Sequence, residues 1–251
     1  MKMPSAIAKV NRNGVLLVFP LNNKKEPKSL WSEFFPKTKM RWEWNDSGDN
    51  RVGQMWSLMK KLSDCRELVY TKWYQGRATF FSKALFSAML CLMRHKIAET
   101  QDADLYAAAA MSESSYFDQG LDQSLNWSCG LTSTAKNILE TLESDSPLST
   151  RDLKKLCELQ GKDNEALYAR AMKSLFSRLL IVAFGEVADG AFPSLAVGAT
   201  RLIFEDLWVA AHELSLPEAQ DLVNQYMPVG SAFRHFFDKN LTSIYSISIN
   251  E

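Results

Sequence analysis

The sequence predicts an α+β fold: a small N-terminal sheet with packed helices, then a winged helix-turn-helix unit, then C-terminal helices. A short β-branched and aromatic run near the N-terminus indicates a buried strand. Apolar residues three and four positions apart indicate amphipathic helices. From residue 131 onward, three helical patterns precede two short strand patterns. The expected divisions are an N-terminal α+β domain (1–111), a linker (112–130), a winged helix-turn-helix domain (131–205) and a helical extension (206–251).

Composition places the chain among ordinary globular proteins. Hydrophobic residues make up 46% and charged residues 23% of its 251 residues. Lys plus Arg equals Asp plus Glu at 29 each, so any affinity for nucleic acid must come from a local basic patch. The apolar stretch 15–21 is too short for a membrane span and no cleavage site follows it. We therefore expect a cytoplasmic protein with no membrane partner.

Cysteine and histidine spacing favours neither a metal site nor a cofactor. No CxxC pair occurs, the histidines share no ligand spacing, and no glycine-rich phosphate loop is found. We expect reduced thiols in or near the core and no bound metal or cofactor. The residues concerned are Cys65, Cys91, Cys129, Cys157, His95, His212 and His235.

In the first half, a strand is expected within residues 13–21, closed by a polar turn. Residues 67–74 and 78–81 are expected to pair as a hairpin, because Gly76 suits the turn between them. Residues 51–62 carry an apolar stripe with helical spacing, which predicts a helix that packs on the sheet.

A strongly apolar helix is expected to follow, with Ser82 as its N-cap and the basic residues 94–96 at its C-terminus. Residues 102–111 are alanine-rich and predict a second helical segment. The small polar residues of 112–130 mark the expected boundary between domains.

The second half carries the helix-turn-helix pattern. Thr132 is the expected N-cap of its first helix, and Ser149 or Thr150 that of its second. Gly161 is expected to end the second helix, and Asp163 or Asn164 to start the third. A strand at 180–184, a glycine-bearing turn at 185–191 and a returning strand at 193–197 would form the wing, with further helices beginning near Leu202 and Pro217.

The third helix supplies the leading candidate for nucleic-acid binding. Its face opposite the apolar stripe would enter the major groove of DNA, with the wing on the backbone or minor groove. The nearby acidic residues Asp163, Glu165, Glu186 and Asp189 oppose DNA binding, and the alternatives are a solvated face or a protein contact. The candidate residues are Arg170, Lys173, Ser174, Ser177 and Arg178, with the three basic side chains contacting phosphates.

The segment 72–83 is a second candidate, since it interleaves cations with aromatic rings as single-stranded nucleic-acid platforms do. The alternative is a hairpin with its aromatic rings in the core and its cations outside. The candidate residues are Lys72, Trp73, Tyr74 and Arg77.

The segment 40–49 is a third candidate, because its carboxylates sit beside two tryptophans that could raise a carboxyl pKa or stack a base. This favours an enzyme acting on a flipped base, with Trp42 or Trp44 stacking on it. The alternative is a polar turn. The candidate catalytic residues are Glu43, Asp46 and Asp49.

Several of these segments resemble the AlkZ-related family of bacterial winged-helix proteins, which is similar to the AlkZ DNA glycosylases that unhook interstrand crosslinks. The residues 131–135, 146–153, 171–182 and 185–187 resemble the winged-helix domain of that family, and 42–44 and 72–81 resemble its first half. The resemblance implies a DNA-related role over most of the chain.

The glycosylases of that group use a Gln-x-Gln or Gln-x-Asp motif to activate water, and no such tripeptide occurs here. The resemblance therefore carries no catalytic residue over to this chain. We expect a DNA-binding winged-helix protein linked to DNA repair. The alternatives are a DNA glycosylase that uses an acidic residue near Trp42 and Trp44, and a non-catalytic module that binds a protein partner.

Overall fold

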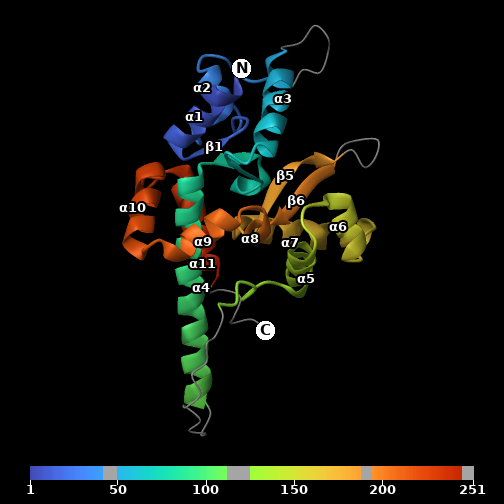
Figure 1. The fold of residues 1–251 in the computed structure, drawn as a ribbon, viewed down its shortest axis with the longest axis vertical. Helices are drawn as coiled ribbons and strands as arrows, with labels where there is room; N and C mark the ends of the chain where they lie inside the picture. Colours follow the sequence, from blue (N-terminus) through green and yellow to red (C-terminus); the bar gives the residue numbers. More distant parts are fainter. Residues whose placement is uncertain (42–49, 112–124, 188–193, 245–251) are drawn as a thin grey trace.

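The computed structural model describes residues 1–41, 50–111, 125–187 and 194–244. Within these residues the chain forms two three-stranded antiparallel sheets surrounded by helices, which confirms the expected α+β class (Figure 1). None of the helices in these ranges combines the length and apolarity that crossing a membrane requires.

The first sheet contains the predicted strand and hairpin. Its strand order is β1-β3-β2, and Leu16 and Tyr70 lie opposite Phe80 from either side. The short 3-10 helix η1 (Tyr74–Gly76) forms the hairpin turn, where Gly76 adopts a φ of +75°. The strands are β1 (Val15–Leu17), β2 (Val69–Thr71) and β3 (Thr79–Phe81), shorter than the apolar runs that predicted them.

Helices α1 (Met3–Asn13), α2 (Leu30–Phe34) and α3 (Arg51–Asp64) share a core with this sheet. Helix α3 was expected, whereas α1 and α2 were not. Helix α1 buries only Ala6 and Val10, a stripe too sparse to stand out as periodic. Helix α2 has five residues and begins at a capping box between Ser29 and Ser32, which is a local signal without periodicity.

Helix α4 (Lys83–Met111) is one continuous helix, about 43 Å long at 1.5 Å per residue, and it runs from the middle of the molecule, below α1, α2 and α3, to its lower end (Figure 1). The Ser82 hydroxyl accepts a hydrogen bond from the Leu85 N–H at 3.4 Å, as expected of an N-cap. The predicted end at residues 94–96 was wrong. No glycine or proline follows them within α4, and Ile97 and Thr100 are buried, so packing carries the helix onward.

The second half folds in the order α5, β4, α6, α7, β5, β6, and its sheet has the strand order β4-β6-β5. The hydroxyls of Thr132 and Ser149 accept hydrogen bonds from backbone N–H groups three residues onward, which confirms both predicted N-caps. The elements are α5 (Ser133–Ser144), β4 (Leu148–Ser149), α6 (Thr150–Leu156), the 3-10 helix η2 (Lys162–Asn164), α7 (Glu165–Ser177), β5 (Ile181–Val187) and β6 (Ser194–Ala199).

Two boundaries differ from expectation. Helix α6 ends at Leu156, well before Gly161. The N–H of Cys157 donates to the carbonyls of Leu153 and Lys155. Gly185 lies inside β5 rather than in a turn, at a shift of register between Ala183 and Glu186. A β-bulge takes up an extra residue here, and glycine suits its positive φ. Residues 188–191 of the predicted turn lie outside the described residues.

The C-terminal helices close the central core. Helices α9 and α10 pack against α4, and Phe233 and Phe237 of α11 are buried beside them. Helix α11, unforeseen as a distinct element, begins at Ser231, whose hydroxyl accepts a hydrogen bond from the Arg234 N–H. These elements are α8 (Thr200–Ile203), α9 (Glu205–Glu213), α10 (Leu216–Tyr226) and α11 (Ala232–Ser243).

Candidate functional site

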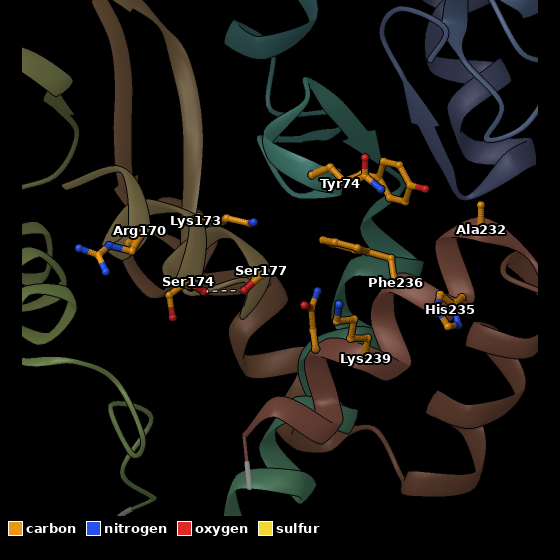
Figure 2. A pocket seen from close by; sticks show the side chains of 11 residues that line it. Tyr74, Arg170, Lys173, Ser174, Ser177, Ala232, His235, Phe236 and Lys239 are labelled. Atoms are coloured by element: carbon orange, nitrogen blue, oxygen red, sulfur yellow. Dashed lines mark hydrogen bonds between the residues drawn. The ribbon is translucent and has the colours of Figure 1, made fainter. Parts of the chain in front are cut away.

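A groove of about 520 Å³ lies between α7, α11 and η1 (Figure 2). It joins three segments that are far apart in the sequence, and two of them were predicted independently as nucleic-acid-binding candidates. Its lining residues are Tyr74, Gln75, Arg170, Lys173, Ser174, Ser177, Ala232, His235, Phe236, Lys239 and Asn240.

The wall contributed by α7 follows from the periodicity of that helix. Its apolar stripe, which includes Leu175 and Phe176, is buried, so the opposite side faces outward. Arg170 and Lys173 are exposed on that side, while Ser174 and Ser177 are half-buried. The Ser177 hydroxyl donates to the Ser174 carbonyl at 2.9 Å (Figure 2). All four predicted residues of this face therefore line one groove.

The opposite wall is α11. Residues 239 and 240 follow residues 235 and 236 by about one helical turn, so the four share one face of the helix. Lys239 and His235 are exposed, and the Asn240 Nδ2 is buried with no hydrogen-bond acceptor among the described residues. The sequence prediction missed this wall. The apolar positions Phe233, Phe237 and Leu241 carried the signal, because their helical spacing turns the residues between them outward.

The third wall is η1, through Tyr74 and Gln75. The Tyr74 ring packs against Phe233 and Phe236 at centroid distances of 5.2 and 5.0 Å. Burial raises the pKa of the Tyr74 hydroxyl. The phenol is therefore a neutral wall of the groove near pH 7.

The groove has a basic lining even though the whole chain is neutral. Arg170, Lys173 and Lys239 contribute cations, and no aspartate or glutamate is among the described residues that line the groove. In the part of the chain that the structure describes, these three cations form no ion pair with a carboxylate. Their charge is therefore available to an anionic ligand.

Two of the acidic residues expected to oppose DNA binding are engaged away from the groove. Glu165 pairs with Lys154 at 2.7 Å, and Glu186 pairs with Lys60 at 3.1 Å. Asp163 is exposed in η2 and does not line the groove, while Asp189 lies outside the described residues.

Trp73 does not form the stacking surface that the sequence predicted. Its side chain is only 1% exposed and packs edge-on against Phe81 and Phe236, with centroid distances of 5.1 and 4.9 Å. Trp73 lies in the turn between β2 and η1, where its ring packs into the core, as the alternative interpretation of this segment held. Trp73 therefore packs behind the groove residue Phe236 and is too deeply buried to contact a ligand.

Arg178 is also buried, at 3% exposure, which corrects its expected role as a phosphate contact. Its guanidinium donates to the carbonyls of Cys129 and Gly130 at 2.6 and 3.0 Å. Burial lowers the pKa of this guanidinium. Arg178 holds the segment before α5 against the end of α7.

Lys72 and Arg77 lie outside the groove lining. Lys72 is half-buried. Burial lowers the pKa of its amine, and the nearby Glu186 carboxylate opposes part of this shift. The Lys72 amine also lies 5.9 Å from the centre of the Tyr70 ring. Strands β2 and β5 contact each other, which brings Glu186 of β5 near Lys72. Arg77 is exposed in the hairpin, next to η1.

The candidate catalytic residues Glu43, Asp46 and Asp49 lie outside the described residues, as do Trp42 and Trp44. Among the residues that are described, no group of three or more His, Cys, Asp or Glu side chains is arranged to hold a metal ion.

Comparison with known proteins gives one match. A search of curated proteins and a search of solved structures each found no match. The family model described as AlkZ related matches residues 1–227, a span that includes α7 and η1 but ends before α11. Because this match covers most of the chain, the protein belongs to the AlkZ-related family.

Proposed function

We propose that this protein binds DNA through the groove between α7, α11 and η1, and that it acts in DNA repair. The name of the family supports the link to DNA chemistry. The basic lining of the groove supports the choice of an anionic polymer as ligand.

The order of elements supports a winged-helix interpretation of the second half. Helices α5, α6 and α7 are followed by the antiparallel strands β5 and β6, with β4 completing the sheet. In this interpretation α7 is the recognition helix, since it is the third helix and its polar face is exposed. The groove residues Arg170 and Lys173 belong to that face.

The observation that carries the proposal is that cations from two separate elements line one groove, with no carboxylate among its described lining residues. Arg170 and Lys173 come from α7, and Lys239 comes from α11. Cations that neutralise phosphates release counterions from DNA, so affinity falls as salt rises. The Ser174 hydroxyl adds a hydrogen-bond donor suited to a phosphate oxygen, whereas that of Ser177 donates to the Ser174 carbonyl.

The test is a titration of labelled duplex DNA, and separately of a labelled single strand, with the wild type and with the double variant Arg170→Glu, Lys173→Glu at two salt concentrations. We expect the variant to bind at least about tenfold more weakly, with a salt slope reduced by roughly two, since each lost phosphate contact removes about one unit. Fluorescence anisotropy measures both quantities.

The matched control is Lys24→Glu, Lys25→Glu, which makes the same change in net charge at exposed positions outside the groove. This control should bind within about twofold of the wild type. Equal loss in both double variants would mean that net charge alone governs binding, and unchanged affinity in the Arg170 and Lys173 variant would exclude the groove as the DNA site.

A further inference from the structure

We propose that the groove takes a single strand of DNA, with one unpaired base stacked on Phe236. This inference rests on the proposed function and names the form of DNA that the site accepts. It assigns a binding role to α11, which lies beyond the residues matched by the family model.

The walls of the groove argue against a duplex at this place. A helix inserted in the major groove, which is about 12 Å wide, has a DNA strand on each side of it. On the Arg170–Ser177 side of α7, that flanking space is already bounded by α11 and η1 (Figure 2). The groove volume of about 520 Å³ is instead in the range of pockets that bind small organic molecules, and one nucleotide is a molecule of that size.

Phe236 has the position and support of a stacking residue. Its side chain points from α11 into the groove (Figure 2) and is half-buried. Trp73 meets the ring at 4.9 Å with an interplanar angle of 88°, and Tyr74 lies 5.0 Å away. Since these two neighbours are themselves buried, they hold the Phe236 ring in place and leave it to meet a base.

The remaining lining fits a strand that passes across this ring. Lys173 and Lys239 stand on the two facing walls, so a phosphate on either side of the stacked nucleotide meets a cation. Cations that follow the backbone, together with an aromatic ring under a base, characterise sites for single-stranded nucleic acid. Because every base has a stacking face, we expect little preference for sequence.

The test compares two single strands of equal length, oligo-dT and an oligomer of abasic sites that has the same phosphates but no bases. Phe236→Ala should lower the affinity for oligo-dT roughly 5- to 150-fold, which corresponds to about 1–3 kcal/mol for one stacked base. The affinity for the abasic strand should stay within about twofold, because the phosphate contacts remain.

Further variants separate stacking from folding. Phe236→Leu keeps an apolar side chain against Trp73 and Tyr74 but removes the aromatic face, and should lose the same preference for oligo-dT while keeping the thermal midpoint of the wild type within a few degrees. Phe34→Leu changes a half-buried phenylalanine in α2, outside the groove, and should bind both strands as the wild type does.

The outcomes distinguish this inference from the proposed function. If both Phe236 variants bind oligo-dT like the wild type, or lose affinity for both strands equally, Phe236 does not stack on a base. If the Phe236 variants give either of these results, but the Arg170 and Lys173 variant weakens the binding of DNA, the proposed function stands and this inference fails. If the wild type binds none of these DNAs at low salt, both fail.

Discussion

Replacing Arg178 by alanine is expected to lower the free energy of unfolding by about 3–5 kcal/mol. The buried guanidinium donates to the carbonyls of Cys129 and Gly130, and hydrogen bonds from a charged group contribute about 1.5–3 kcal/mol each. In the variant both carbonyls lose their partner, and a void remains at the end of α7. Urea denaturation followed by circular dichroism measures the change.

Arg170→Ala is the matched control, since Arg170 lies on the exposed face of α7. Its free energy of unfolding should stay within about 0.5 kcal/mol of the wild type. The order of the two effects should reverse in a DNA titration: Arg170→Ala should weaken binding, whereas folded Arg178→Ala should not. A stability loss below about 1 kcal/mol for Arg178→Ala would contradict the structural role assigned to this side chain.

Gly14→Ala is expected to destabilise the protein by about 4 kcal/mol, the second large effect. Gly14 follows α1 with φ +73° and ψ −48°, a conformation that residues with a Cβ rarely adopt. An added Cβ would also lie 2.5–2.6 Å from the Cβ and ring carbons of Tyr226 in α10. The backbone at Gly14 therefore fixes how closely α10 approaches the N-terminal sheet. The midpoint and slope of urea denaturation give the size of the effect.

Gly76→Ala separates strain from close approach. Gly76 has nearly the same φ, +75°, but no atom of a described residue outside its own chain neighbours lies within 4 Å of the position of an added Cβ. Only backbone strain should remain, which costs about 1–2 kcal/mol. If the two variants lost equal stability, the contact with Tyr226 would contribute nothing, and this account of Gly14 would be wrong.

Local signals predicted much of the second half. Hydroxyls at Thr132 and Ser149 cap helices where capping residues precede an apolar stripe, and the stripe of α7 placed its polar face correctly. Such signals act over three or four residues, so the sequence displays them directly. Where they are weak, as in α1, the helix depends on tertiary packing and was not foreseen.

The site itself depended on contacts between distant segments. Sequence reasoning found the α7 face and the hairpin as separate candidates, and could not show that α11 would complete a groove between them. It also assigned binding roles to Trp73 and Arg178 from their residue types alone, because the sequence does not show whether a given side chain is buried or exposed. Burial is a property of the packed chain, which explains why these two were misassigned.

The net charge of the chain was similarly uninformative about the site. Equal numbers of basic and acidic residues conceal a groove whose described lining residues include cations and no carboxylates. Glu165 and Glu186, expected to oppose DNA binding, form ion pairs with Lys154 and Lys60, and Asp238, next to Lys239 in the sequence, pairs with Arg234. A local patch of this kind is what a neutral DNA-binding protein requires.

Photocrosslinking tests the central claim most directly, since it reports where DNA lies on the protein. Oligo-dT carrying 5-iodo-deoxyuridine at successive positions is irradiated with the wild-type protein, and crosslinked peptides are identified by mass spectrometry. We predict crosslinks to peptides that contain His235 and Phe236 of α11 and Tyr74 of η1, since these aromatic side chains line the groove. Crosslinks confined to peptides that contribute nothing to the groove would contradict the account.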